Sequence, residues 1–417
     1  MTMKRISTNM PNYDMSYYMR LREWKMNELQ NKMAAQTRLK NLRDDPLAAG
    51  HATRYQSKVV RLGRFIDNIS KIRGDMALAE GNIRSGLDIL QRVRELAVQG
   101  ANGIYDDQQI AYMAEEVDQL LRELVEIANS VDGKGNHIFS GFRSKIEPFR
   151  VSTGRVEGSR DAEVVTSVEY VGDNGRNRGE IDEMATLDFR LPGNFVFWAE
   201  RQQIYSSVES LNYRVQNDSA IRIDGVEIQL KEGDNLYAII DKLNASEAPV
   251  KARLDPVENA LALEGTFPHQ IWPEDLRGTV LQDLGIIARG SESPPLNVAD
   301  SAAAYGGSIF DMVITLRNGM YENDIHRIGG DGLRGIDDAV ETLTANLAEI
   351  GSKDSRLQIT EQRLEYERPE YISFLAKEAD LDITEAITDL KMLEYVHQAA
   401  VGTAARIIRP SLLDFLR

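Results

Sequence analysis

The stretch from Asp44 to Gly103, DDPLAAGHATRYQSKVVRLGRFIDNISKIRGDMALAEGNIRSGLDILQRVRELAVQGANG, decides the fold of this chain. Its apolar residues alternate by three and four, which is the a and d spacing of a heptad repeat. Only Gly86 carries no apolar side chain in this seam, which comprises Leu62, Phe65, Ile69, Ile72, Met76, Ala79, Ile83, Gly86, Leu90, Val93 and Ala97. The spacing predicts one long helix with a coiled-coil seam.

The ends of this helix are encoded locally. Asp45 is a favourable N-cap, and Pro46 suits the first helical position, where no amide donor is needed. Gly100 and Gly103 mark the end of the helix. Because a helix of about 55 residues is about 80 Å long, it needs partner helices along its length, and we expect the rest of the chain to supply them.

Length and composition bound the class of protein. A chain of 417 residues is long enough for two or three domains. It contains no cysteine, which excludes disulfides, thiolate metal sites and cysteine nucleophiles. Residues 1–12 lack the apolar core of a signal peptide, and no uncharged run approaches the roughly 20 apolar residues that span a bilayer. We therefore expect no membrane insertion and, if the protein is exported, a route without a cleavable signal.

The net charge of −16 is unevenly distributed. Residues 1–145 carry 22 Lys and Arg against 18 Asp and Glu, residues 146–330 carry 17 against 30, and residues 331–417 carry 10 against 17. Because phosphate binding needs concentrated positive charge, the acidic middle argues against nucleic acid as a partner. An acidic solvated surface is the simpler interpretation.

Helical patterns occupy both ends of the chain, and a different pattern lies between them. Further helices are expected over about 16–36 and 107–131, from Leu333 to about Pro369, and from about Asp382 to Ile408. The second seam supplies Leu343, Leu347 and Ile350 to the predicted rod core, together with Leu62, Phe65, Ile69, Ile72, Met76, Ile83, Leu90 and Val93.

Between the helical ends, residues 146–330 contain short alternating runs separated by Gly, Asn, Asp and Pro clusters, which is typical of strands and hairpins. The runs include 162–171, 195–198 and 221–230, the last with a tight turn at Asp224-Gly225. One helix is expected within this block, from Leu236 to Leu243. The predicted fold class is α+β: a discontinuous long coiled-coil rod built from both chain ends, with a β-rich domain inserted between them.

The terminal helices carry more apolar surface than their own chain can cover. No charged residue occurs from Tyr395 to Ala405, and a helix that is apolar nearly all round must be buried. At a chain terminus, other subunits are the simplest source of that burial. The predicted assembly interface comprises Leu21, Trp24, Leu29, Met33, Ile387, Leu390, Leu393, Tyr395, Val396, Val401, Ile408, Leu412, Leu413, Phe415 and Leu416.

Short motifs in both ends resemble the flagellin superfamily of bacterial axial proteins. Leu90–Gly103 (LQRVRELAVQGANG) is similar to a segment on the long N-terminal helix of that family, and Ile407–Arg417 (IIRPSLLDFLR) to its closing signature. Within the superfamily, Arg5–Met10 (RISTNM), Asp44–Ala49 (DDPLAA) and Gly135–Gly141 (GNHIFSG) resemble the hook–filament junction proteins, the hook-associated protein 3 family. Residues 221–287 also look like the IN motif found in insertions of flagellins and hook-associated proteins.

The resemblance implies three parts. Residues 1–45 with 375–417 form a terminal helical assembly domain, 46–145 with 331–374 form a helical rod domain, and 146–330 form the β-rich insertion domain. It also implies a structural role in the bacterial flagellum: a helical adaptor layer between another hook-associated protein and flagellin, serving motility. Subunits stack through heterologous contacts. The resemblance further implies export in an unfolded state through the flagellar type III apparatus, with a chaperone covering the C-terminal helix. The expected location is extracellular or, for an internal flagellum, periplasmic.

Two other functions remain open at this point. A filament flagellin would form long polymers, but the Pro46 context and the PSLLDFL ending favour the junction family. A cytosolic coiled-coil scaffold or binding module would instead use the acidic insertion as its working part. It predicts a stable homo-oligomer whose terminal helices are ordered without partners.

Enzymatic and metal sites find little support in the sequence. Asp173–Glu183 resembles a calcium loop, but Arg178 occupies the position that needs glycine. Gly329–Gly332 lacks the Lys-Ser/Thr that follows in a phosphate loop. The histidines show no ligand spacing with carboxylates: His51, His137, His269, His326 and His397. We expect no enzyme, no metal and no cofactor.

Overall fold

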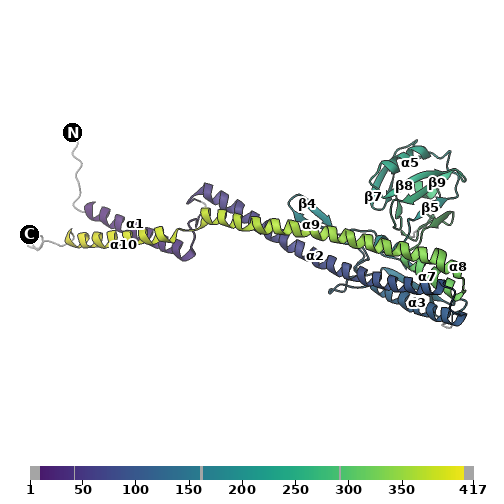
Figure 1. The fold of residues 1–417 in the computed structure, drawn as a ribbon. Helices are drawn as coiled ribbons and strands as arrows, with labels where there is room; N and C mark the ends of the chain where they lie inside the picture. The colour runs from purple at the N-terminus through teal and green to yellow at the C-terminus, as the bar shows by residue number, and fades with distance from the viewer. Residues whose placement is uncertain (1–9, 42, 160–162, 291–292, 408–417) are drawn as a thin grey trace, which may run out of the picture. The chain divides into compact units, whose positions relative to one another are not determined.

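The computed structural model describes residues 10–41, 43–159, 163–290 and 293–407. The chain forms two compact units: the residues up to Ile66 with those from Glu361 onward, and the residues from Asp67 to Thr360. Two helices, α2 (Pro46–Ala101) and α9 (Leu333–Ala379), contribute to both units. Figure 1 shows these long helices and the strands that the sequence inserts between them.

Helix α2 buries the seam that its sequence encodes. Asp45 Oδ1 accepts a hydrogen bond from the Ala48 N–H (3.0 Å), which satisfies one free amide of the first turn. The eight α2 residues of the predicted rod core each expose 8% or less of their surface: Leu62, Phe65, Ile69, Ile72, Met76, Ile83, Leu90 and Val93. At Gly86 an added Cβ would lie 3.3 Å from Leu124 Cδ1, so the missing side chain makes room for a neighbouring helix.

Helix α9 runs antiparallel to α2 within the unit from Asp67 to Thr360. Arg73 pairs with Asp354 (2.8 Å) and Arg94 with Asp337 (2.6 Å), so positions later in α2 meet positions earlier in α9. On α9, Leu343 and Ile350 are buried and Leu347 is half-buried: these are the C-terminal members of the predicted rod core. The short α8 (Ile325–Arg327) and the π-helical turn η1 (Ile328–Gly332) lead into α9.

The second long helix does not end at Pro369, where the sequence pattern predicted its end. Helix α9 continues through Pro369 to Ala379, ten residues beyond the boundary that the sequence indicated. Proline removes one amide donor, and the bonded turns on either side hold the helix together.

Helices α3 (Asp107–Ala128) and α7 (Ile309–Tyr321) pack against each other in the same unit. Each begins with a capping box, formed by Asp106 with Gln109 in α3 and by Ser308 with Asp311 in α7. Helix α7 was not among the predicted elements, because its sequence, IFDMVITLRNGMY, is apolar on most sides and short.

The other unit contains a pair of terminal helices, α1 (Met10–Ala35) and α10 (Ile383–Ile407), which lie side by side (Figure 1). Backbone hydrogen bonds join the segments that follow α1 and precede α10. The Arg38 N–H donates to the Ala379 carbonyl (2.8 Å), and the Leu381 N–H donates to the Gln36 carbonyl (3.2 Å). These bonds fix where the two helices start to run together.

In the described part of residues 149–305 the strands form four small sheets, and the strands within each sheet pair antiparallel. Two are hairpins, β1–β2 and β3–β4; the others have the orders β10-β6-β7 and β11-β5-β9-β8. Three short helices accompany them. The bounds are β1 (Phe149–Gly154), β2 (Val164–Tyr170), β3 (Arg178–Asp182), β4 (Ala185–Asp188), α4 (Gly193–Val196), β5 (Gln203–Ser206), β6 (Ser219–Ile223), β7 (Val226–Leu230), α5 (Leu236–Ala245), β8 (Val250–Asp255), β9 (Ala260–Gly265), β10 (Pro273–Arg277), α6 (Val280–Asp283) and β11 (Ala302–Tyr305).

Strands β5 to β11 with α5 and α6 enclose a core of their own, which we call the inserted domain. Its buried residues include Ile204, Ile221, Ile239, Leu263 and Leu281. The predicted turn at Asp224-Gly225 is confirmed: both residues have positive φ (49° and 85°) and join Ile223 to its pairing partner Val226. The glycine supplies one left-handed position at no steric cost.

Hairpin β3–β4 lies directly on α2. A Cβ on Gly179 would come within 2.3 Å of Ile72 Cδ1, and Asn68 Nδ2 donates to the Glu180 carbonyl (3.3 Å). Met184 at the tip of this hairpin is fully exposed. The absence of a side chain at Gly179 therefore permits the close approach that anchors the hairpin.

The predicted fold class is confirmed: long helices from both ends of the sequence, with small antiparallel sheets between them. Besides the end of α9, a second local prediction was wrong. Phe195–Trp198 was expected to be a strand, but Phe195 and Val196 lie in the single helical turn α4 and Phe197 follows as its C-cap; all three are buried. A short apolar run does not distinguish a strand from a buried helical turn.

Candidate functional site

The predicted assembly residues of α1 lie at or near the surface. Trp24 exposes 58% of its surface, whereas Leu21, Leu29 and Met33 are half-buried. Three further aromatic side chains on this helix were absent from the prediction although they are exposed: Tyr13, Tyr17 and Tyr18. Their close spacing in YDMSYY was the available signal in the sequence.

Helix α10 exposes still more apolar surface. Tyr395 exposes 76%, Ile387, Val396 and Val401 each expose about 40% or slightly more, and Leu390 and Leu393 are half-buried. Among the described side chains of α10, Ala386 is the one that is fully buried. The predicted interface residues Ile408, Leu412, Leu413, Phe415 and Leu416 lie outside the described residues.

The α1–α10 pair is therefore a helical surface rich in exposed apolar groups. Exposed apolar groups in such numbers are typical of surfaces that bind other proteins. Few charged contacts cross the pair in the described region; one is His397 Nε2 to Glu23 Oε1 at 3.9 Å. We call the exposed apolar residues of α1 and α10 the terminal surface.

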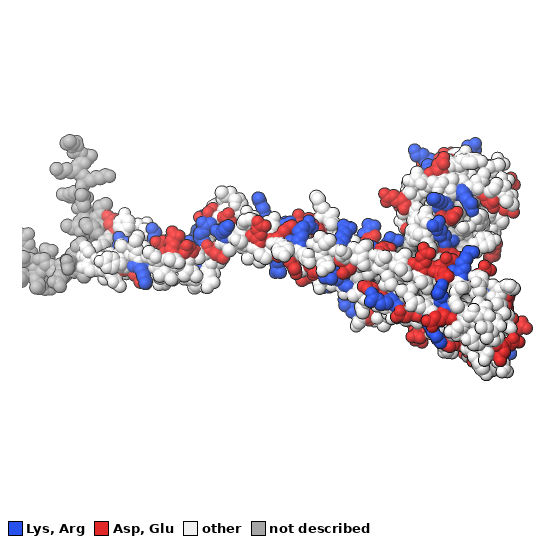
Figure 2. Space-filling model, in the orientation of Figure 1, with Lys and Arg blue, Asp and Glu red and all other residues white. Residues whose placement is uncertain are grey.

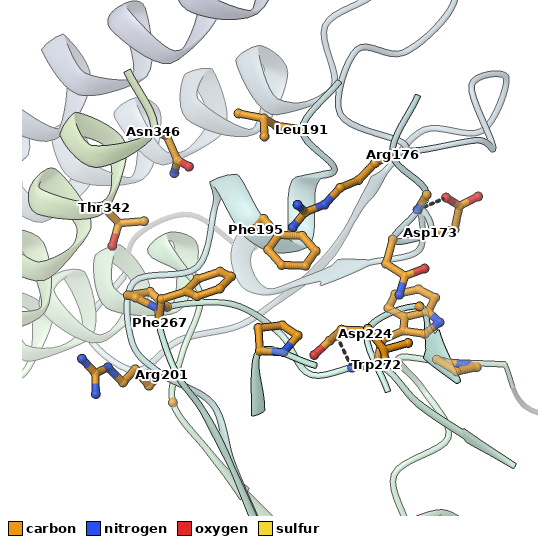
Figure 3. A pocket seen from close by; sticks show the side chains of 18 of the residues that line it. Asp173, Arg176, Leu191, Phe195, Arg201, Asp224, Phe267, Trp272, Thr342 and Asn346 are labelled. Carbon is orange, nitrogen blue, oxygen red and sulfur yellow. Dashed lines mark hydrogen bonds between the residues drawn. The ribbon is translucent and has the colours of Figure 1, made fainter. Parts of the chain in front are cut away.

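A second feature is an open cleft of about 1760 Å³ in the unit from Asp67 to Thr360. One wall is a face of α9 that includes Thr342 and Asn346, and opposite it lie Phe195 and Phe267, as Figure 3 shows. Several charged residues that line the cleft form ion pairs with each other. Examples are Arg222 with Glu274 (3.3 Å) and Arg334 with Glu200 (3.9 Å).

The GNHIFSG turn leads to one rim of this cleft. Asp173 Oδ1 accepts hydrogen bonds from the N–H groups of Phe142 and Gly175 (both 2.8 Å), and its Oδ2 accepts one from the Arg143 N–H (3.0 Å). The buried hydroxyl oxygen of Tyr170 lies 2.6 Å from the Asp173 carbonyl oxygen and 3.1 Å from the Phe139 carbonyl oxygen, and burial raises the pKa of this phenol. The faint calcium-loop resemblance at Asp173 thus corresponds to a carboxylate that binds backbone amides.

The remaining candidates for chemistry have structural partners. His51 contacts Glu378 (3.4 Å), His137 Nδ1 donates to the Asn129 carbonyl (2.7 Å), and His269 contacts Asp224 (3.1 Å). Across the described ranges, no three His, Cys, Asp or Glu side chains are placed to hold a metal ion. The helices that the structure describes also include none with the length and apolarity needed to cross a bilayer.

Charge on the molecule is mixed rather than segregated. Figure 2 shows Lys and Arg interspersed with Asp and Glu along the face in view. Many of these groups form short-range ion pairs on helix surfaces, such as Arg84 with Glu80 and Arg92 with Glu116. Such a surface favours solvation over the binding of a polyanion.

Two segments match known protein families. Residues 6–144 match the bacterial flagellin N-terminal helical region, and residues 213–266 match the flagellin hook IN motif. These matches confirm the resemblance to the flagellin superfamily that the sequence motifs indicated.

The individual proteins that match this chain are distant from it and match over part of its length. Flagellin E of Vibrio cholerae is 21% identical over 293 residues, which cover 67% of this chain and 73% of that protein. Flagellar hook-associated protein 3 of Salmonella typhimurium is 27% identical over 136 residues, which cover 33% of this chain and 42% of that protein. A crystal structure of hook-associated protein-3 from Legionella pneumophila aligns with a TM-score of 0.46 at 18% identity, covering 78% of this chain and 97% of that one.

Proposed function

We propose that this chain, which carries the flagellin N-terminal helical region and the flagellin hook IN motif, is a structural protein of the bacterial flagellum that joins hook to filament. The observation that carries the proposal is the terminal surface, where large apolar side chains of α1 and α10 are exposed. Exposed apolar surface on a helix pair is typical of a site that another protein covers. The role is mechanical and needs no catalysis, metal or cofactor.

The proposed partners are other flagellar axial proteins, with a hook-associated protein on one side and flagellin on the other. Copies of this chain form one layer of a helical ring through heterologous contacts, the geometry that builds tubes. Burial of Trp24, Tyr395 and their neighbours drives the association, because aromatic side chains bury large areas. The entropy cost of ordering the terminal helices is offset only when the partner surface is present. This limits premature polymerisation.

Within this role, the three parts keep the bounds suggested by the sequence. Residues 1–45 with 375–417 form the assembly domain, residues 46–145 with 331–374 the rod, and residues 146–330 the insertion. The buried seam stabilises the rod. The acidic insertion would make any contacts with molecules outside the layer of subunits.

Export through the flagellar type III apparatus is part of this proposal, and the composition of α10 bears on it. The uncharged run from Tyr395 to Ala405 would expose apolar groups in the cytoplasm before assembly. An export chaperone that covers this run would prevent aggregation, in the manner of an amphipathic helix held in a groove. The final location is the hook–filament junction, outside the cell or in the periplasm when the flagellum is internal.

A filament flagellin is the second candidate, and the similarity to Flagellin E over 67% of this chain favours it. The two functions differ in what the purified protein does. A filament protein elongates on its own seeds into long polymers, whereas a junction protein adds one short zone to another protein's end. Electron microscopy of the chain, alone and on hook-associated seeds, distinguishes them.

Hydrogen exchange by mass spectrometry tests the proposal directly. In the isolated monomer, α1 and α10 should exchange fast, while the buried stretch of α2 is protected; adding the correct axial partner should protect both terminal helices. The substitution Tyr395→Asp should abolish this protection, and Tyr366→Asp should not, because Tyr366 is equally exposed (83%) but lies on α9 outside the terminal surface. Protected terminal helices in the isolated monomer would contradict the junction role and favour a self-contained coiled-coil scaffold.

A further inference from the structure

Asparagine is followed directly by glycine at three places in the chain: Asn102-Gly103, Asn174-Gly175 and Asn318-Gly319. Asparagine is among the chemically labile residues of proteins. In such a pair the glycine nitrogen can attack the side-chain carbonyl carbon of the asparagine, because glycine has no Cβ to block the approach. The reaction needs an asparagine side chain that is free to turn and a glycine amide that no acceptor holds. The three pairs differ in both respects.

The first pair lies in the connection between α2 and α3, directly after the last residue of α2. Both Asn102 and Gly103 are exposed, and Gly103 has the left-handed φ of +64° that is common after a helix. The Asn102 N–H donates to the Gln99 carbonyl (3.2 Å). Within the described ranges, neither the Asn102 side chain nor the Gly103 N–H has a hydrogen-bond partner. The two reacting groups are therefore free.

The second pair is held by its neighbours in the chain. The Gly175 N–H donates to Asp173 Oδ1 (2.8 Å), and Gly175 is buried. Asn174 Nδ2 is buried as well. The ring of Phe142 occupies the space where a Cβ of Gly175 would lie. Attack by the Gly175 nitrogen would first require this hydrogen bond to break and the turn to open.

The third pair lies inside α7, where the helical backbone binds its own amides. Gly319 is buried, and Asn318 Oδ1 accepts two hydrogen bonds from the Arg317 guanidinium (3.3 and 2.8 Å). Arg317 is itself buried and paired with Asp118, so it holds the Asn318 side chain in place. The helix must unfold locally before the Gly319 nitrogen can react.

We propose that Asn102 is a modification site, at which the folded protein loses the side-chain amide to water while Asn174 and Asn318 are protected. A bond forms between the Gly103 nitrogen and Asn102 Cγ, and the bond from Cγ to the side-chain nitrogen breaks. Ammonia leaves with the proton that the Gly103 amide gives up. Water then adds to one of the two carbonyls of the resulting succinimide ring, which opens to aspartate or isoaspartate.

The product places a negative charge at the C-terminal end of α2. The free carbonyls of the last turn already give this end a partial negative charge, so the new carboxylate is repelled. Asp106 caps α3 and Asp107 begins it, so two further acidic groups follow in the same connection. Isoaspartate also lengthens the main chain by one methylene group. Both products therefore loosen the last turn of α2. This proposal concerns the α2–α3 connection and does not depend on the flagellar role.

Peptide mass mapping of the full chain after incubation in warm neutral buffer tests the site, because exchange of an amide for a carboxyl group changes the mass of the peptide. Asn102 should react at least about tenfold faster than Asn174 and Asn318, the factor expected when one hydrogen bond must break first. In urea the three rates should become similar. Equal rates in the folded chain would overturn the proposal. A faster Asn102 in urea as well would contradict the role assigned to the fold.

Hydrogen exchange tests the loosening. Asn102→Asp carries the charge of the product, and it should lower the protection of the amides at 98–101 by about two- to fivefold, the range expected for a like charge at a helix end. Asn102→Gln is the matched control, because it keeps a neutral amide, and it should retain the wild-type protection. Protection that is unchanged in Asn102→Asp would refute the loosening step.

Discussion

Arg317 on α7 and Asp118 on α3 form an ion pair from which water is excluded: the arginine side chain is 0% exposed and the aspartate side chain 6%. Burial lowers the pKa of the guanidinium, and the Asp118 carboxylate opposes that effect. Asp118 also pairs with Arg122 one helical turn away (3.0 Å), and Arg317 donates two hydrogen bonds to Asn318 Oδ1. The pair sets the register in which α7 packs on α3.

The substitution Asp118→Asn should destabilise the unit from Asp67 to Thr360 by about 3–5 kcal/mol, because it leaves a buried guanidinium without a counter-charge. Urea unfolding monitored by circular dichroism measures the change. The matched control is Asp337→Asn, which breaks the half-exposed pair with Arg94 and should cost less than about 1 kcal/mol. Equal effects of the two substitutions would show that burial adds nothing to the Asp118 pair.

Asp275 gives the inserted domain a stability that falls with rising pH. Burial raises the pKa of its carboxyl to about 6, even though the N–H groups of Leu281 and Gln282 donate to it. A raised folded-state pKa means that the folded form binds the proton more tightly than the unfolded form. The resulting stability is complete below the unfolded value of about 3.9 and is lost as pH rises through about 6.

Asp275→Asn should therefore raise the melting temperature of the inserted domain at about pH 7 relative to wild type, and the advantage should vanish toward about pH 4. An asparagine keeps one acceptor for the two amides, so a constant offset from the lost second bond is also expected. Differential scanning calorimetry at a series of pH values separates the two. Parallel curves for the two proteins would contradict the assignment of this pH dependence to Asp275.

Asp132 should act in the opposite direction. Its pKa is lowered to about 2, first by the backbone N–H of Asn136, with further bonds from Asn136 Nδ2 and the Lys134 N–H. The stability that it provides is present above about pH 4 and is lost as pH falls through about 2. Asp132→Ala should cost about 1–3 kcal/mol at neutral pH through its unmade hydrogen bonds. In acid-unfolding experiments the variant and wild type should converge at the lowest pH, and a gap that persists there would argue against the depressed pKa.

Gly141, the last residue of the GNHIFSG turn, has no room for a side chain. Its φ is +70°, and an added Cβ would lie 2.1 Å from Asp173 Oδ1 and 2.5 Å from the Asp173 carbonyl oxygen. Gly141→Ala should destabilise the protein by more than about 1 kcal/mol. The positive φ is strained for alanine, and the added methyl group would clash with Asp173. Gly133→Ala, a few residues earlier with nothing within 4 Å of its Cβ position, should be nearly neutral in the same thermal unfolding assay.

The parts of the fold that rest on local periodicity could be predicted from the sequence. The α2 seam repeats over many turns, and the Asp224-Gly225 turn combines two residues that accept positive φ. Helix α7 and the turn α4 escaped prediction because their burial comes from segments distant in sequence. Trp198, beside α4, bridges to Ser308, which is over a hundred residues later and begins α7.

Functional features divide in the same way. The uncharged run of α10 signals an exposed apolar surface directly, because no folding is needed to see its composition. The pairing of Asp224 with His269 depends instead on a contact between residues 45 apart in the sequence. An Asp and a His at that separation form no recognisable sequence motif. Only the three-dimensional structure shows that the two side chains are in contact.

The exposed Met184 at the tip of hairpin β3–β4 has a practical consequence for experiments. Hairpin tips that make no packing contacts tolerate substitution, and here the strands below the tip are anchored on α2 at Gly179. Since the chain has no cysteine, Met184→Cys creates a single thiol in the whole protein. A fluorophore or spin label attached there would follow the protein through export and assembly in living cells while the terminal helices stay chemically untouched.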